Sequence, residues 1–232
     1  EIVSSKMSEN VKNTLLSCLL MRSAEQNMPS AVRYLLEQGA SLSATDDDGR
    51  NALLLASLHG GIDAVRILID STASIDAVDN DNNTAMVLAA ERGHVNVLQV
   101  LLDAKANINI QNSDGMNALM KAVVHGHATC AELLLDAKAD LEAKSNDGSS
   151  ALAYAAEKGH LEYTKLLISK KADCNTKSMI KETALMRAVA YGHVTCAQLL
   201  IDSNAIINAT NNSGKTALII SAQNGHVACA EI

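Results

Sequence analysis

The sequence predicts an all-α fold, an α-solenoid in which similar helix–turn–helix units stack in single file. Two observations predict it: residue patterns recur every 33 positions along nearly the whole chain, and the composition suits thin helical layers. Of the 232 residues, 48% are apolar but only 2% are aromatic. A core of Ala, Leu, Ile, Val and Met packs closely only in thin, regular layers. The single proline, where average usage would give about 12, leaves helices uninterrupted.

Three patterns share the 33-residue period. The first is Gly-His, at Gly93-His94, Gly126-His127, Gly159-His160, Gly192-His193 and Gly225-His226. The second is Ala followed by an apolar residue, at Ala52-Leu53, Ala85-Met86, Ala118-Leu119, Ala151-Leu152, Ala184-Leu185 and Ala217-Leu218. The third is a pair of large aliphatic residues, at Leu35-Leu36, Leu68-Ile69, Leu101-Leu102, Leu134-Leu135, Leu167-Ile168 and Leu200-Ile201. Three patterns in phase indicate a repeat architecture.

The polar segments between these patterns divide the chain into repeats, which together form one domain over residues 13–232. The full repeats are expected at 46–78, 79–111, 112–144, 145–177 and 178–210. A degenerate unit, 13–45, precedes them and a truncated unit, 211–232, follows them. Residues 1–12 form an N-terminal extension outside the period.

Repeat 112–144 illustrates the expected local structure. Asp114-Gly115 supplies a tight turn, a short helix covers Ala118–Val124, and a second helix covers Ala128–Asp136. Gly126 stands between them, where the first helix must end in the left-handed conformation that glycine adopts without penalty.

The degenerate unit 13–45 is expected to have the same two helices and turn, formed by different residues. Asn27 replaces the glycine at the end of the first helix, and Asn is the next most tolerant residue there. Pro29 then falls in the first turn of the second helix, where proline is accepted.

These residues closely resemble the ankyrin repeat, a 33-residue unit of a turn and two helices with a Thr-Pro-Leu-His-x-Ala signature. The resemblance covers residues 13–232. It rests on the Gly-His pairs, the aliphatic pairs, the turn Asp46–Gly49 and the equivalent turn glycines Gly115, Gly148 and Gly214. It implies an ankyrin-repeat α-solenoid with hairpin-like turn tips.

The chain departs from the family pattern at the signature proline and histidine. Alanine replaces the proline in all six units. The histidine is replaced by Leu54, Val87, Met120, Ala153, Met186 and Ile219. The Thr–His hydrogen bonding that the family often uses is therefore absent, and we expect apolar packing in its place. Two turns also lack glycine: Asn82 stands there in 79–111, and 178–210 opens with Ser178-Met179-Ile180-Lys181.

The overall charge and the cysteines limit the setting of the protein. A net charge of −7 argues against a nucleic-acid partner, which normally needs a basic face. Five cysteines with no CxxC motif suit a reducing, cytoplasmic compartment.

No apolar run approaches a membrane span and no signal peptide opens the chain, so we expect no membrane contact. We also expect a monomer. The chain begins at Glu1 and ends inside a helix of the last repeat, so we expect the natural protein to continue.

No catalytic constellation emerges, and we expect no enzyme activity, cofactor or metal. Ser213-Gly214-Lys215-Thr216 resembles the end of a phosphate-binding loop, but the earlier glycine of that motif is Ala209. His125 and His127 lack further ligands at metal-binding spacing, and a hydrogen-bonding role for the repeated histidines explains them better. Cys130, Cys196 and Cys229 share one position of the second helix, which predicts buried small hydrophobes.

The resemblance implies a partner site on the concave face formed by the first helices and the turn tips. Basic and aromatic residues vary along the first helices while the core positions hold. The predicted concave-face residues are His59, Arg92, Lys121, His125, Tyr154, Lys158, Arg187 and Tyr191. Arg and Tyr are residue types that often anchor interfaces.

The turn tips form the second part of the predicted site. They are largely acidic, with an apolar exception in repeat 178–210. The predicted tip residues are Asp47, Asp48, Asp81, Asp114, Asp147, Met179 and Ile180. Met179 and Ile180 could either contact a partner or pack over the neighbouring tip. An acidic rim beside a basic groove suits a peptide or protein of mixed charge.

The sequence thus predicts a non-enzymatic scaffold that binds an unidentified protein or peptide through its concave face. An alternative is the regulatory or targeting region of a larger multidomain enzyme, such as a protein kinase, since arrays of this family are often joined to other domains. Natural variation between the units and the five cysteines argue against an engineered binder.

Overall fold

A computed structural model describes the backbone of residues 2–232 and the side chains of residues 9–232. Helices provide the regular structure of this part of the chain, together with one isolated antiparallel bridge between Val78 and Thr84. The chain divides into two compact units, Glu1–Ser113 and Asp114–Ile232, which are described separately. No helix of residues 2–232 has the length and apolar character needed to span a bilayer.

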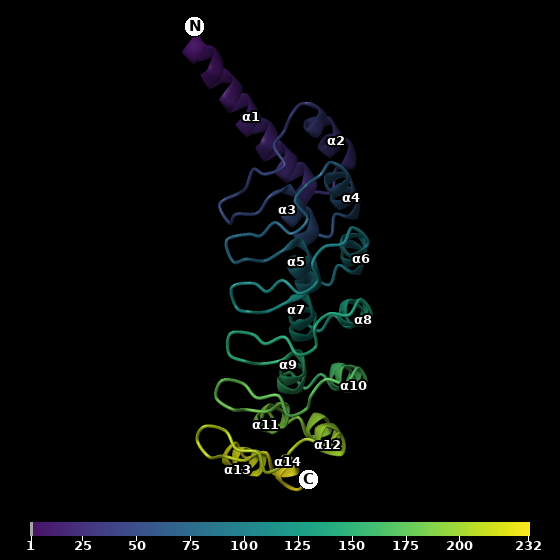
Figure 1. The fold of residues 1–232 in the computed structure, drawn as a ribbon, viewed down its shortest axis with the longest axis vertical. Coiled ribbons are helices and arrows are strands. Elements are labelled where there is room, and N and C mark those ends of the chain that lie inside the picture. The colour runs from purple at the N-terminus through teal and green to yellow at the C-terminus, as the bar shows by residue number, and fades with distance from the viewer. Residues whose placement is uncertain (1) are drawn as a thin grey trace. The chain divides into compact units, whose positions relative to one another are not determined.

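The first unit contains three helix pairs. Its helices are α1 (Ile2–Glu25), α2 (Pro29–Glu37), α3 (Ala52–Leu58), α4 (Ile62–Asp70), α5 (Ala85–Arg92) and α6 (Val95–Asp103). Helices α1, α3 and α5 pack in one row, which we call the inner row, and α2, α4 and α6 pack beside it as the outer row. In Figure 1 the turn tips lie on the side of the inner row away from the outer row.

The second unit repeats this arrangement. Its helices are α7 (Ala118–Val124), α8 (Ala128–Asp136), α9 (Ala151–Glu157), α10 (Leu161–Ser169), α11 (Ala184–Ala190), α12 (Val194–Asp202), α13 (Ala217–Gln223) and α14 (Val227–Ala230). The odd-numbered helices form its inner row and the even-numbered helices its outer row. Helices α7 and α8 begin and end at the predicted residues, and Gly126 adopts the predicted left-handed φ of +78°.

Helix α1 is longer than the 33-residue period requires. It spans 24 residues without a break, so the expected limit between an extension and the first unit falls inside it. Its C-terminal half packs into the fold and buries Leu20, Met21 and Ala24, whereas Val11 and Leu15 on the preceding turns are exposed. Asn27 has the expected positive φ of +50°, and Pro29 opens α2 as predicted.

A hydrogen-bonding residue opens each inner helix from α3 to α13. In each case its side-chain oxygen accepts a hydrogen bond from the backbone amide three residues later, which satisfies a donor left free at the helix start. These N-cap residues are Asn51, Thr84, Asn117, Ser150, Thr183 and Thr216. They occupy the threonine position of the family signature, so that position caps the helix even though its histidine partner is absent.

Apolar residues replace the signature histidine as expected in five of the six repeats. Leu54, Val87, Met120, Ala153 and Met186 are each at most 4% exposed. The exception is Ile219, which is 42% exposed. The expectation is wrong there because α13 packs mainly on α11 and α14 and is the last inner-row helix of the described residues.

The turn tips of successive repeats are linked by backbone hydrogen bonds. The amide of Asn80 donates to the carbonyl of Asp48, and that of Ser113 donates to Asp81, over 3.0 and 2.8 Å. In the second unit the amides of Asn146, Met179 and Asn212 donate to Asp114, Asp147 and Ile180 in the same way. These bonds fix each tip against its neighbour within a unit.

The histidines that open the outer helices form a second kind of link between repeats. His94 Nε2 lies 3.0 Å from the carbonyl oxygen of Leu58, in the preceding repeat. His193 and His226 contact the carbonyls of Glu157 and Ala190 in the same way. The expected hydrogen-bonding role of the repeated histidines is confirmed at these positions. His160 differs, because its ring lies against the ring of Tyr163, at 5.2 Å between centroids.

Thr72 provides a test of the backbone conformation that ends each outer helix. It has a φ of +66°, which costs a β-branched residue more than it costs glycine, and Gly39 occupies the equivalent place one repeat earlier. We expect Thr72→Gly to raise the free energy of unfolding by about 1 kcal/mol, as measured by urea denaturation.

The reverse change is the matched control. A Cβ atom added to Gly39 would meet nothing within 4 Å, so Gly39→Thr should lower the free energy of unfolding by a similar amount through conformation alone. Unchanged stability in both variants would contradict this explanation.

Candidate protein-interaction surface

The predicted concave-face residues lie at the C-terminal ends of the inner helices. In the first unit His59 follows α3 and Arg92 ends α5. In the second unit three of the predicted residues lie within inner helices: Lys121 in α7, Tyr154 in α9 and Arg187 in α11. The other three directly follow these helices: His125, Lys158 and Tyr191. Cations are also favoured at these ends by the helix dipole.

These residues differ in their access to solvent. His59, Arg92, His125, Lys158 and Tyr191 are exposed, and 60% of Tyr191 is accessible. Lys121 and Tyr154 are half-buried. Arg187 is buried, with 9% exposure, so its guanidinium faces the protein. The exposed members can contact a partner directly, whereas Arg187 cannot do so to the same extent.

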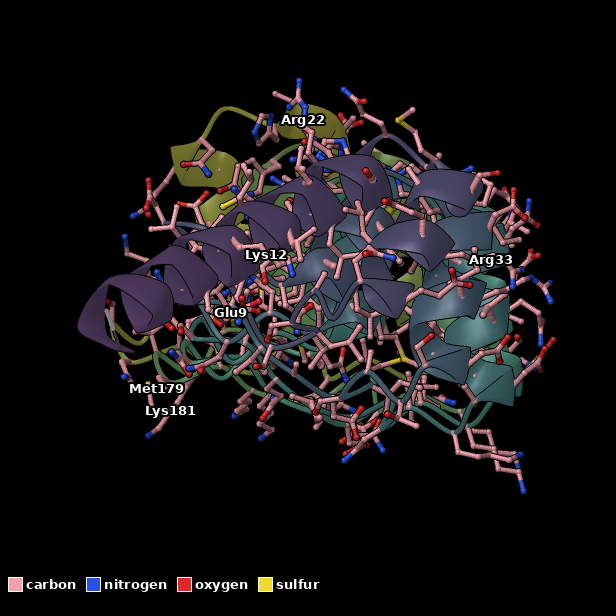
Figure 2. The ribbon with its side chains drawn as sticks, turned by 90° about the horizontal axis from the view of Figure 1, so that it is seen from above. Glu9, Lys12, Arg22, Arg33, Met179 and Lys181 are labelled. Carbon is pink, nitrogen blue, oxygen red and sulfur yellow. The ribbon has the colours of Figure 1, made fainter. Side chains whose placement is uncertain are left out.

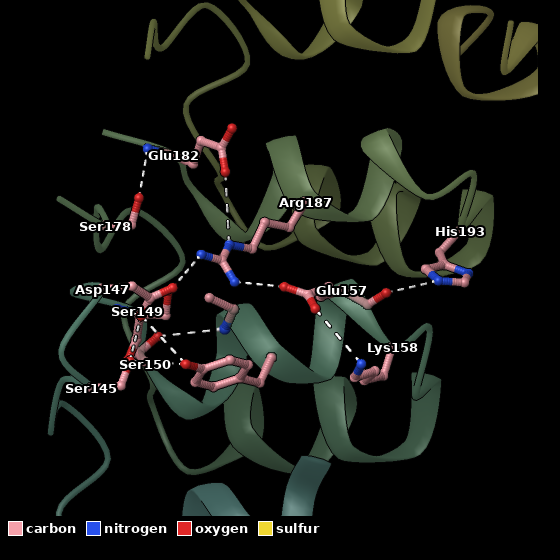
Figure 3. A network of polar contacts seen from close by, with 12 residues as sticks. Ser145, Asp147, Ser149, Ser150, Glu157, Lys158, Ser178, Glu182, Arg187 and His193 are labelled. Carbon is pink, nitrogen blue, oxygen red and sulfur yellow. Dashed lines mark hydrogen bonds and ion pairs between the residues drawn. The ribbon is translucent and has the colours of Figure 1, made fainter. Parts of the chain in front are cut away.

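Arg187 is the centre of a polar network that joins two turn tips to two inner helices (Figure 3). One guanidinium nitrogen lies 2.6 Å from Glu157 on α9, and another lies 2.8 Å from Asp147 on the preceding tip. Its Nε lies 3.9 Å from Glu182 on its own tip. The three carboxylates surround one cation, which offsets the cost of burying it.

Tyr154 also belongs to this network, because its ring lies against the Arg187 guanidinium. The Arg187 side chain lies over its ring, 5.7 Å from the centroid, a cation–π arrangement. The Tyr154 hydroxyl donates to Ser145 Oγ over 3.0 Å and reaches Asp147 over 3.3 Å. Three predicted site residues, Asp147, Tyr154 and Arg187, are thus in contact with one another.

The network shifts the pKa values of its members. Burial alone would raise the pKa of Asp147, but hydrogen bonds from Ser145, Arg187 and Ser149 outweigh it and hold this pKa well below its ordinary value. Burial, aided by the negative charge of Asp147, raises the pKa of Tyr154 above its ordinary value. Ionised Asp147 therefore stabilises the fold above its ordinary pKa of 3.8, and this contribution is lost as the pH falls toward its lower folded-state pKa.

The acidic tip residues point mainly to solvent. Asp47, Asp48 and Asp81 in the first unit are exposed, as are Asp114 and Asp147 in the second. Two of them are also paired: Asp48 contacts Arg50 on its own tip, and Asp147 contacts Arg187 while its side chain remains 50% exposed.

Met179 and Ile180 extend from the tip of repeat 178–210. Their exposures are 73% and 52%, so the interpretation that they pack over a neighbouring tip is wrong. Lys181 takes the place of the turn glycine, with a φ of +60°, and Asn82 does the same in repeat 79–111 with a φ of +58°.

His59 lies beside a groove of the first unit. The groove has a volume of about 310 Å³ and runs between α1 and the tip that contains Asp46 and Arg50. Glu25 lies 3.8 Å from the His59 ring across it. The groove places α1 on the same surface as the predicted concave-face residue.

The cysteines and the His125–His127 pair are the groups whose residue types suggest reactivity or metal binding. Cys130, Cys196 and Cys229 are at most 5% exposed, which confirms their expected burial, and all five cysteines are free. Burial raises the pKa of Cys130 to about 11. The rings of His125 and His127 are stacked, 6.5 Å apart. Within the described residues, no three His, Cys, Asp or Glu side chains gather as a metal site would require.

The sequence analysis missed Glu157 and Glu182 as partners of Arg187. A partial signal was available, because the equivalent position is apolar in three other repeats (Leu55, Leu88 and Ile220), although Lys121 and Tyr154 occupy it in the remaining two. A buried arginine on an inner helix requires acidic partners. The sequence does not show which carboxylates supply them, since they come from segments 5 to 40 residues away.

Replacing the central cation tests the network. We expect Arg187→Met to lower the free energy of unfolding by about 2 kcal/mol, because three carboxylates would remain close together without their cation. The loss should be smaller than for a fully buried pair, since Asp147 is half-exposed. The measurement is urea denaturation at neutral pH.

Lys165 on α10 is the control, because its ion pair with Glu162 is exposed at the surface. Lys165→Met should change the stability by less than about 0.5 kcal/mol. An equally small change for Arg187→Met would show that the network contributes nothing to the fold.

The comparisons with known proteins agree with this architecture. The family model of ankyrin repeats (3 copies) matches residues 20–112, 101–178 and 173–232. Among solved structures, the chain is similar to the ankyrin repeat domain of Bcl-3, a member of the IkappaB protein family. The identity is 28% and the TM-score 0.79, over 87% of this chain and 92% of that one. The comparison with curated proteins gave no match. The repeats, the paired helices and the linked tips together establish that the chain belongs to the ankyrin-repeat family.

Proposed function

We propose that this protein binds a partner protein or peptide on the concave side of its second unit, where the ends of the inner helices meet the turn tips. Ankyrin repeats generally mediate protein–protein interaction and are typically non-catalytic. The specific surface and the scaffold role are our proposal.

One observation carries the proposal: Lys158 and Tyr191 are exposed at equivalent ends of two neighbouring inner helices, α9 and α11. The Tyr191 ring is stacked on His193, 6.4 Å between centroids, and His193 is held by its contact with the Glu157 carbonyl. A tyrosine that is both exposed and held in place loses little conformational freedom on binding, which favours it as an anchor.

The Arg187 network supports this surface from beneath. Arg187 ties α9 to the tips that carry Asp147 and Glu182, so the helix ends and the tips keep a fixed arrangement. We propose that Arg187 and Tyr154 position this surface, whereas Lys158 and Tyr191 contact the partner. The free cysteines support the proposed reducing, cytoplasmic setting.

A double variant tests the surface. We expect Lys158→Ala with Tyr191→Ala to reduce the recovery of partner proteins by about tenfold in a quantitative pull-down, because both anchors are lost. The thermal unfolding temperature should change little, since both side chains are exposed.

The matched control removes two exposed polar side chains from the outer row, Lys165→Ala with Gln198→Ala. This variant should capture every partner at the wild-type level. If the inner-row variant also captured every partner unchanged, the proposed surface would be wrong.

A further inference from the structure

The tip of repeat 178–210 is unlike its neighbours in the second unit. Met179 and Ile180 stand where the preceding tip has Asn146 and Asp147. They are 73% and 52% exposed, and Figure 2 shows Met179 and Lys181 projecting outward beside each other. Two large apolar side chains therefore face solvent at a place where the neighbouring tip is polar.

The backbone of this tip is held on both sides. The Met179 amide donates to the Asp147 carbonyl over 2.8 Å, and the Asn212 amide donates to the Ile180 carbonyl over 2.9 Å. Asn212 also donates from its side chain to the Met179 carbonyl over 3.3 Å. Within the tip, the backbone amide of Lys181 donates to the carbonyl of Ser178 over 2.8 Å. The apolar pair is thus presented by a fixed backbone, which lowers the entropy lost on binding.

Two cations flank the apolar pair. Lys177 and Lys181 are exposed, and within the described residues neither ammonium group forms a hydrogen bond or ion pair. The nearby carboxylates of Asp147 and Glu182 are directed toward Arg187. Lys181 also keeps a left-handed φ that glycine would adopt at less cost. Two exposed lysines therefore flank Met179 and Ile180 on a protein whose net charge is −7.

We propose that this tip binds an acidic peptide segment of a partner protein, in which an apolar side chain covers Met179 and Ile180 and flanking carboxylates pair with Lys177 and Lys181. The inference deepens the proposed function and rests on it, because it names the chemistry of the partner. The carboxylates supply the charge that complements the two lysines, and the apolar side chain removes exposed hydrophobic surface from water.

A protein segment suits this tip better than an anionic membrane. Binding to a bilayer surface needs a larger apolar face and several cations. Here only two exposed apolar residues and two lysines are available on the tip. A peptide segment can cover this small apolar pair, whereas a bilayer surface needs more.

The test compares the full chain with a variant that carries the neighbouring tip. Met179→Asn, Ile180→Asp and Lys181→Gly reproduce the sequence of residues 146–148 on repeat 178–210, so the fold should be retained, as checked by circular dichroism. A displayed library of random peptides is selected on the wild-type chain and depleted on this variant. We expect the enriched peptides to place Asp or Glu beside a large apolar residue.

The affinity of an enriched peptide is then measured by fluorescence anisotropy. The tip variant should weaken it by about tenfold, and added salt should weaken it further because the lysines contribute through charge. Ile206→Asn is the matched control: Ile206 is 56% exposed in the same unit, and its neighbours Ala205 and Ile207 are apolar. This control should bind as the wild type does.

Three results would overturn the inference. One is the absence of any peptide that distinguishes the wild type from the tip variant, and another is enrichment of basic peptides. The third is tip-dependent binding to vesicles of phosphatidylserine and phosphatidylcholine without peptide binding. If the depletion step leaves no peptide, selection on the wild-type chain alone separates the two proposals. Peptides that then depend on Lys158 and Tyr191 would leave the proposed function intact, and peptides that depend on neither surface would contradict both.

Discussion

Several neighbouring repeats are joined by a contact between the histidine of one repeat and the glycine of the repeat before it. The His94 ring lies over Gly60, so closely that a Cβ atom on that glycine would stand 2.7 Å from Nδ1. Its Nε2 also meets the carbonyl oxygen of Leu58. The same contact recurs between Gly192 and His226, where the corresponding distance is 2.8 Å. The Gly-His pattern therefore has two causes: glycine supplies the left-handed turn and leaves room for the next histidine.

At the boundary between residues 13–45 and 46–78 the glycine stands at the histidine position, and a residue with a side chain stands at the glycine position. Asn27 takes the glycine position and has a side chain, and the residue that would be histidine in the next repeat is Gly61. A Cβ atom on Gly61 would lie 3.2 Å from the Asn27 side chain. Instead, Asn27 Oδ1 accepts a hydrogen bond from the Ala64 amide at the start of α4. The two exceptions to the pattern thus compensate each other across one repeat boundary.

Much of the fold could be predicted from the sequence because ankyrin contacts join equivalent positions of neighbouring repeats. The period placed both helices of repeat 112–144, and the conformations of Asn27 and Pro29 followed from local chemistry. The surroundings of Arg187 could not be predicted in the same way. Its partners occupy different repeat positions, on two tips and one helix, and only the folded chain brings these together. The exposure of Met179 and Ile180 was likewise undecided, because sequence does not show whether a tip covers its neighbour.

A double-mutant cycle at Gly60 and His94 tests the inter-repeat contact most directly, with the free energy of unfolding as the measured quantity. Gly60→Ala should cost about 3 kcal/mol, from the left-handed conformation and the clash together. Gly225→Ala should cost only about 1 kcal/mol, because a Cβ atom there meets nothing within 4 Å. In a His94→Gly background the cost of Gly60→Ala should fall to about the Gly225→Ala value. Equal costs for Gly60→Ala with and without His94 would contradict the account.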